Sequence, residues 1–113
     1  MANYKPRRQS KRWLDGDCPK GVLAILDNKG QSADRYTVIY AEPIVGDTYS
    51  SMVLGYRSMS ENPFHAQGVG MYGEFSAHDC AMYRYRFKHH YAKWSSLPDA
   101  VKRCVRQDLD SAE

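Results

Sequence analysis

The chain has 113 residues, of which 42% are apolar, and it carries a formal net charge of +3. This length suits a single domain with one modest hydrophobic core. No apolar run is long enough to span a bilayer, and the charged N-terminus is not followed by the apolar stretch of a secretory signal. We therefore expect a soluble, cytoplasmic protein without membrane contact, whose three cysteines, Cys18, Cys80 and Cys104, are reduced.

The N-terminal segment is basic and lacks apolar periodicity. Its first thirteen residues contain five positive charges and no acid, at Lys5, Arg7, Arg8, Lys11 and Arg12. This composition is typical of a solvated, unstructured segment. We predict a flexible basic arm over residues 1–18, with Trp13 as a candidate to dock its end, a single domain over residues 19–109, and an acidic tail over residues 110–113.

The next part of the chain predicts an antiparallel hairpin. Residues 21–26 form a continuous apolar run, which favours a buried strand, and residues 35–40 alternate as a half-buried strand does. The residues Asp27-Asn28-Lys29-Gly30 between them have turn chemistry. Pro43 ends the second strand because proline cannot donate to the ladder, and residues 51–56 predict a third strand.

Residues 60–74 have the composition of neither a strand, a helix nor an ordinary linker. Their three glycines, at positions 68, 70 and 73, permit positive φ angles or a close approach to another surface. Phe64, His65 and Tyr72 supply side chains that can anchor a partner. The segment therefore predicts a binding loop.

The segment from residue 77 to residue 94 favours a fourth strand, with a helix as the alternative. Aromatic and basic residues alternate from 83 to 87, which in a strand would place Tyr85 on one face. The opposite face would then carry Arg84, Arg86 and Lys88, which are suited to acidic or phosphate groups.

The last element is a predicted amphipathic helix of about three turns. Ser95-Ser96 offers an N-cap, Pro98 suits the first turn, and Asp99 favours the positive end of the helix dipole. Apolar residues recur at helical spacing, at Leu97, Val101, Cys104, Val105 and Leu109. The order of elements predicts an α+β fold, in which a small antiparallel sheet of three to four strands carries the C-terminal amphipathic helix on one face.

Catalytic and metal chemistry find little support in the motifs. The histidines and cysteines lack the two close ligand pairs of a zinc finger, so we expect no metal and no cofactor. A small hydrolase would need Cys80 or Ser60 beside His65 or His78, yet no catalytic motif accompanies these residues. A nucleic-acid-binding module is the better alternative, because the basic strand and the arm could contact phosphates, although a solvated strand face has the same pattern.

Residues 55–68, Gly-Tyr-Arg-Ser-Met-Ser-Glu-Asn-Pro-Phe-His-Ala-Gln-Gly, resemble a family of short uncharacterised proteins from bacteriophages and mobile elements. The recurring stretch of that family runs approximately M-S-x-x-P-F-H-P-Q-G-F-G-Q-H-G-E, and the resemblance extends more loosely over residues 20–110. Here Ala66 replaces the second proline, Val69 the phenylalanine, and Met71-Tyr72 the glutamine and histidine. The family has no assigned reaction. The resemblance implies a small accessory gene, of the kind that often encodes inhibitors of host defence, including anti-CRISPR proteins.

Together these features predict a non-enzymatic binding protein of a phage or mobile element, active as a stoichiometric anti-defence inhibitor. Its partner would be a host protein or ribonucleoprotein complex, with nucleic acid as the alternative, and the chain would be a monomer or homodimer. The predicted partner-binding residues are Phe64, His65, Tyr72 and Tyr85. The predicted contacts to phosphate or acidic groups are Arg84, Arg86, Lys88, Arg7 and Arg8.

Overall fold

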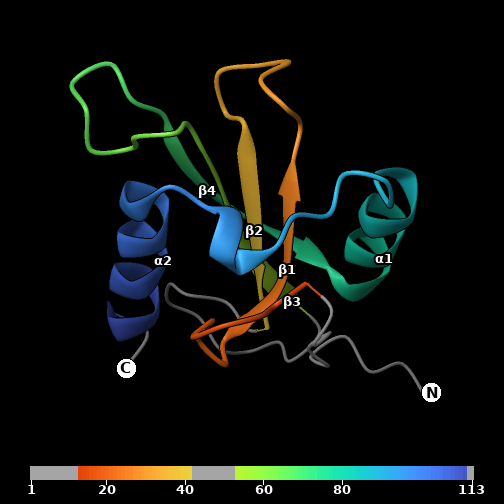
Figure 1. The fold of residues 1–113 in the computed structure, drawn as a ribbon. Coiled ribbons are helices and arrows are strands. Elements are labelled where there is room, and N and C mark those ends of the chain that lie inside the picture. Colours follow the sequence, from red (N-terminus) through yellow and green to blue (C-terminus); the bar gives the residue numbers. More distant parts are fainter. Residues whose placement is uncertain (1–12, 42–52, 112–113) are drawn as a thin grey trace.

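A computed structural model describes residues 13–41 and 53–111, and Figure 1 shows its ribbon. Four strands form one antiparallel sheet, accompanied by two α-helices and a short 3-10 turn. In chain order the elements are β1 (Val22–Asp27), β2 (Tyr36–Tyr40), β3 (Val53–Met59), β4 (Gly70–Ser76), α1 (Ala77–Arg86), η1 (Trp94–Ser96) and α2 (Asp99–Ser111). The predicted α+β class, with its small antiparallel sheet and C-terminal helix, is confirmed.

The sheet is a meander in the order β1-β2-β3-β4, so that each strand pairs with its neighbour in sequence. The predicted hairpin over residues 21–40 is present as β1 and β2. The outer edge of β1 is partly covered, because Asp27 donates its N–H to the carbonyl of His90 and Ala92 donates its N–H to that of Ile25. β4 lies at the opposite edge of the sheet.

The alternation of side chains along the strands divides the core between the two faces of the sheet. On β2, Val38 and Tyr40 face α2, whereas Ile39 points to the side of α1. The α2 face packs with η1 and α2 through Trp94, Leu97, Val101, Cys104 and Val105. The α1 face packs Leu23, Ala24, Leu26, Ile39 and Leu54 with Cys80.

A buried carboxylate ties α2 to the sheet. Asp108 is only 7% exposed, and it accepts hydrogen bonds from the Tyr40 hydroxyl at 2.6 Å and from Arg57 Nε at 2.9 Å. Arg57 also donates through Nη2 to the second carboxylate oxygen, so the ion pair is bidentate. Its ion pair with Asp108 raises the pKa of Arg57, and burial raises the pKa of Tyr40. One polar cluster therefore joins β2, β3 and α2.

The start of α2 differs from the prediction. The helix begins at Asp99, and the first backbone bond of its ladder runs from Lys102 N–H to the carbonyl of Pro98. Ser95 and Ser96 were predicted to cap it, but they lie in η1, where Ser95 bonds Asp15 and the Ser96 hydroxyl bonds the carbonyl of Lys93.

The segment preceding β1 packs against the domain from residue 13 onward. The Trp13 ring stacks on Tyr91 at 5.6 Å, as expected of a docking residue. Asp17 accepts a hydrogen bond from the buried indole N–H of Trp94 at 2.9 Å and pairs with Arg106 at 2.7 Å. Residues 13–18 of the predicted arm therefore pack against the domain, and residues 1–12, with Arg7 and Arg8, lie outside the described residues.

The prediction of a strand within residues 82–94 is wrong, because residues 77–86 form α1. Ser76 caps this helix by accepting a hydrogen bond from the N–H of Asp79 at 3.0 Å. Arg84 and Arg86 lie in the last turn, where positive charge is favoured by the helix dipole. The helical conformation places Cys80 on the inner side of α1, where it is buried against the sheet.

The fourth strand lies instead within the predicted binding loop. Residues 70–76 pair with β3 along its whole length, from Met59 opposite Gly70 to Val53 opposite Ser76. The pairing tolerates Gly73 because the Tyr56 ring lies over it, so closely that an added Cβ would be 2.5 Å from that ring. Only residues 60–69 remain as a loop between the two strands.

Removing the charge of Asp108 should lower the free energy of unfolding of the protein. The Asp108→Asn variant leaves the Arg57 guanidinium partly buried without its counterion, which costs about 3 kcal/mol in the free energy of unfolding. Urea denaturation followed by circular dichroism measures this loss. Asp110→Asn, at an exposed acid on the same helix, serves as the matched control and should change stability by less than about 0.5 kcal/mol. Equal losses in the two variants would contradict the role of Asp108.

Acid should release residues 13–18 from the domain. The hydrogen bond from Ser95 lowers the pKa of Asp15, and that from Trp94 lowers the pKa of Asp17. A lowered folded-state pKa stabilises the fold above the unfolded value of about 3.9, and this contribution is lost as the pH falls through the lower folded value. The indole N–H resonance of Trp94 should therefore shift below about pH 4. In Asp17→Asn this acid-dependent shift should disappear, and its persistence would assign it to another group.

Candidate binding surfaces

Four large apolar side chains are exposed on the described part of the chain: Phe64 at 43%, Met71 at 58%, Met82 at 56% and Tyr85 at 68%. Phe64 lies in the loop between β3 and β4, and Met71 lies on β4. Met82 and Tyr85 both lie on α1, three residues apart, so that they are neighbours on the helix surface. Two exposed apolar side chains, Met82 and Tyr85, are therefore neighbours on the outer face of α1.

Basic side chains surround this pair on α1. Lys88 Nζ lies 4.3 Å from the centre of the Tyr85 ring, and Arg86 lies over the neighbouring ring of Phe87. Arg84 points elsewhere: its Nε donates to the Tyr91 hydroxyl at 2.9 Å. Of the five predicted basic contact residues, Arg86 and Lys88 are exposed and Arg84 is half-buried, while Arg7 and Arg8 lie outside the described residues.

Side chains of the loop between β3 and β4 contact α2 or other residues of the same loop. Phe64 packs under Arg103 of α2, whose guanidinium carbon lies 4.3 Å from the ring centre. His65 is exposed, but its Nδ1 accepts a hydrogen bond from the N–H of Gln67. Gly68 approaches the carbonyl of Asn62 so closely that an added Cβ would lie 2.3 Å from it, so the expected close approach occurs within the loop itself.

Tyr72, the remaining predicted anchor, belongs to β4 and is half-buried. Its hydroxyl donates to Glu74, and Arg57 lies over its ring at 5.7 Å. Its ring also covers Gly55 on the neighbouring strand. The side chain therefore has a structural role in joining β3 to β4.

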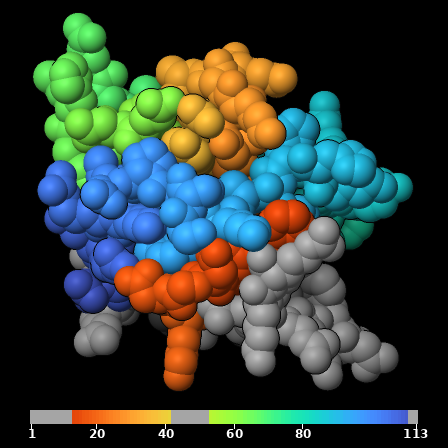
Figure 2. Space-filling view, viewed as in Figure 1, coloured from red at the N-terminus to blue at the C-terminus, as the bar shows by residue number. Residues whose placement is uncertain are grey.

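The loop and α1 lie on opposite sides of the molecule. Figure 1 shows residues 60–69 above α2 at one end, with α1 at the other. The space-filling view in Figure 2 shows the same separation between the green loop and the teal helix. The predicted contact residues of the loop and those of α1 therefore lie at opposite ends of the molecule.

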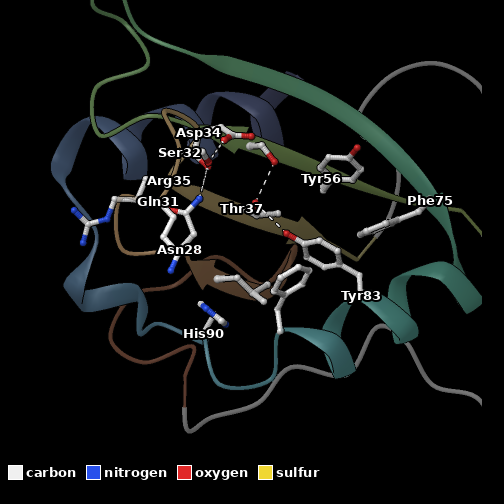
Figure 3. A pocket seen from close by; sticks show the side chains of 13 residues that line it. Asn28, Gln31, Ser32, Asp34, Arg35, Thr37, Tyr56, Phe75, Tyr83 and His90 are labelled. Carbon is white, nitrogen blue, oxygen red and sulfur yellow. Dashed lines mark hydrogen bonds between the residues drawn. The ribbon is translucent and has the colours of Figure 1, made fainter.

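A pocket of about 550 Å³ opens on the α1 face of the sheet. It lies between α1 and the segment that joins β1 to β2 (Figure 3). Its aromatic side is formed by Tyr56, Phe75, Tyr83 and Phe87. Its polar side is formed by Asn28, Gln31, Ser32, Asp34, Thr37 and Ser58.

The aromatic side is a continuous row of tilted rings. The ring centres of Tyr56 and Phe75 are 4.7 Å apart, those of Phe75 and Tyr83 are 5.8 Å apart, and those of Tyr83 and Phe87 are 4.8 Å apart. His90 continues the row at the edge of Phe87, and its buried Nδ1 has no hydrogen-bond partner. These rings come from two strands, the helix and the segment after it, so the fold alone brings them together.

Hydrogen bonds fix the polar side. The Thr37 and Ser58 hydroxyls lie 3.1 Å apart across β2 and β3, and the Tyr83 hydroxyl reaches Thr37 at 3.5 Å. The Ser32 hydroxyl accepts from Asn28 Nδ2 at 2.8 Å and donates to Asp34 at 2.5 Å. The sequence analysis missed this site, although two hydroxyl residues at inward strand positions were a signal for it.

Among the described residues, no hydrogen bond joins Cys80 or Ser60 to His65 or His78, although Ser60 and His65 line the same small pocket. Cys80 is fully buried, and burial raises the pKa of its thiol to about 11. Ser60 is held in the loop, where its hydroxyl accepts from the N–H of Val69 at 3.0 Å. Within residues 13–41 and 53–111, no group of three or more histidine, cysteine or acidic side chains is placed to hold a metal ion.

Comparison of the chain with protein-family models, with curated proteins and with solved structures finds no match. Neither of the two described α-helices is long and apolar enough to cross a membrane. The interpretation of the surfaces therefore depends on their geometry and charge.

The thiols should resist modification in the folded protein. Burial raises the pKa of Cys18 and of Cys80 to about 11, and burial also raises the pKa of Cys104. At pH 8 only about one thiol in a thousand with a pKa near 11 is ionised, and the thiolate is the reactive form. Iodoacetamide labelling at pH 8, read by mass spectrometry, should be slow for the native chain and rapid for all three cysteines in denaturant. Rapid labelling of Cys80 in the native chain would contradict this prediction and support the alternative of a hydrolase that uses this cysteine.

Proposed function

We propose that this protein is a non-enzymatic binding protein whose contact surface is the outer face of α1. The observation that carries the proposal is the adjacent exposure of Met82 and Tyr85 on this helix. Burial of methionine and aromatic side chains provides much of the energy at protein interfaces. A helix face with two such neighbours suits insertion into an apolar depression on a partner.

The charge around this face indicates an acidic partner surface. Arg86, Lys88 and His89 are exposed at the end of α1 and just beyond it, and Asp79 at the helix start is the exposed acid. Positive charges at the rim of an interface accelerate association with an acidic surface and disfavour basic partners. The proposed partner is therefore a protein with an acidic surface around an apolar depression.

The resemblance of residues 55–68 to phage and mobile-element proteins supports a host protein or ribonucleoprotein as that partner. In this role the protein blocks a component of host defence by occupying its surface, one inhibitor for each target. The burial of Cys80 and the internal hydrogen bonds of Ser60 and His65 favour binding over hydrolysis by these residues.

Photo-crosslinking tests which surface binds. The tagged full chain, carrying p-benzoylphenylalanine at position 85, is irradiated in bacterial cells, and the adduct is identified after nuclease treatment. A discrete protein adduct is expected at position 85. The same residue at position 71 is the matched control, because Met71 is as exposed as Met82 but lies on β4. An adduct at position 64 alone would assign binding to the loop, and a nuclease-sensitive adduct would favour the nucleic-acid module.

Alanine at position 85 should weaken capture of the crosslinked partner about thirtyfold, the effect of losing a central aromatic contact of ~2 kcal/mol. Biolayer interferometry with the purified partner measures this change. Arg86→Glu with Lys88→Glu should slow association, most strongly at low salt. Met71→Ser should leave both rates unchanged. If Tyr85→Ala and Met71→Ser bind equally well, the α1 surface is not the interface.

A further inference from the structure

The pocket on the α1 face is lined by aromatic rings and hydrogen-bond acceptors, whereas the outer face of the same helix is bordered by basic side chains. We propose that it binds an organic cation, a guanidinium or alkylammonium group, presented by an arginine or lysine side chain or by a free amine. This inference concerns a separate site and does not depend on the partner proposed for the outer face of α1.

The floor of the pocket is polar because the sheet register places hydroxyl residues there. Leu26, Thr37, Ser58 and Met71 lie opposite one another in one row across all four strands. Thr37 and Ser58, at the centre of this row, are small and point to the α1 face. Of the acceptor lone pairs on the two hydroxyl oxygens, two on each, the contact between the hydroxyls uses one and the Tyr83 hydroxyl uses another on Thr37. The floor therefore retains acceptor capacity for a ligand that donates hydrogen bonds.

The pocket is lined by one acid, Asp34, and by one permanent cation, Arg35, whose charge is offset by Asp27 and Glu61 outside the lining. Arg35 is the lining residue with a permanent positive charge, and its guanidinium is already engaged. Its Nε donates to Asp27 at 2.7 Å and its Nη1 donates to Glu61 at 2.6 Å. Asp34 forms no ion pair with any described cation, and its carboxylate accepts a hydrogen bond from the Ser32 hydroxyl. A carboxylate at the edge of an aromatic pocket favours a cation and disfavours phosphate.

Three of the four rings on the aromatic side of the pocket lack a described cation, whereas most other described rings have one. Seven described rings have an arginine or lysine of the chain over them, namely those of Tyr36, Phe64, Tyr72, Tyr85, Phe87, Tyr91 and Trp94. No described cation lies over Tyr56, Phe75 or Tyr83, which face the pocket. An aromatic face attracts a cation within about 6 Å of its centre. These rings can therefore receive a cation from outside the chain.

The shape of the pocket matches the two parts of such a ligand. Figure 3 shows Tyr56, Phe75 and Tyr83 on one side and Asn28, Ser32 and Asp34 on the other. The apolar stem of an arginine or lysine side chain would lie along the rings, as such stems cover apolar surface elsewhere in proteins. Its charged head would then reach Asp34 and the Thr37–Ser58 hydroxyls, which are all acceptors.

Titration of the ¹⁵N-labelled full chain tests this proposal directly. The probes are Nα-acetyl-arginine amide, Nα-acetyl-lysine amide and agmatine, with Nα-acetyl-citrulline amide as the uncharged isostere of the arginine probe. At least one cationic probe should shift the amide resonances of Asp34, Ser58 and Tyr83 at millimolar concentration. Citrulline should bind about tenfold more weakly, the effect expected for one hydrogen bond between charged groups.

Variants locate the site. Asp34→Asn should weaken the best cationic probe about tenfold while keeping the acceptor for Ser32, and Tyr83→Leu should weaken it about threefold. Asp110→Asn, at an exposed acid on α2, is the matched control and should bind as the unmodified chain does. Thermal unfolding of each variant shows whether the fold is retained. A variant that unfolds is replaced by Ser58→Val, which removes a floor hydroxyl and should also weaken binding.

The probes also separate the two sources of the cation. Tighter binding of the acetylated amides than of agmatine indicates a side chain of a partner protein, and the reverse indicates a free amine. The proposal fails if citrulline binds as tightly as arginine, if Asp34→Asn binds as tightly as Asp110→Asn, or if the pocket resonances do not move at tens of millimolar. None of these outcomes bears on crosslinking through position 85.

Discussion

A single serine fixes where the two candidate sites lie. Ser76 is the last residue of β4 and also the N-cap of α1, with its hydroxyl bound to the N–H of Asp79 at 3.0 Å. Because no linker separates the edge strand from the helix, α1 must lie beside β3 and β4. Its inner side packs Cys80 against the sheet, and its outer side leaves Tyr85 in solvent. The part of the sheet face that α1 does not reach becomes the pocket.

The other face of the sheet is closed by a different set of constraints. There the buried Asp108 binds Arg57 and Tyr40, and Trp94 fills the core while its indole N–H is satisfied by Asp17. A buried carboxylate and a buried indole both need partners, so these contacts restrict α2 and the residues before β1 to one position. The α2 face is therefore structural, and the features available for recognition gather around α1.

The sequence predicts the elements that show a clear pattern of apolar residues along the chain. It misses the elements whose conformation depends on contacts with residues far away in the sequence. The apolar run of β1 and the helical spacing of Val101, Cys104 and Val105 in α2 were sufficient to predict these elements. From Tyr83 to Phe87 aromatic and basic residues alternate as in a strand, yet Tyr83 packs on Phe75 from a helix. The pattern Ser-x-x-Asp at Ser76 and Asp79 was the available signal for a helix start. β4 was missed because Tyr56 of β3 covers its Gly73, and its own Tyr72 covers Gly55 of β3, which only the paired structure reveals.

The candidate site depended even more on the fold. Asp34, Ser58 and Tyr83 are far apart in sequence, and a shift of one residue in the pairing of β2 and β3 would leave only one of the Thr37 and Ser58 hydroxyls on the α1 face. Asp34 lines the pocket together with aromatic rings, whereas Arg86 and Lys88 are exposed at the end of α1 and just beyond it. The net charge of +3 conceals this division. Because the fold separates the charges, recognition by this protein is better inferred from the two sides of α1 than from its composition.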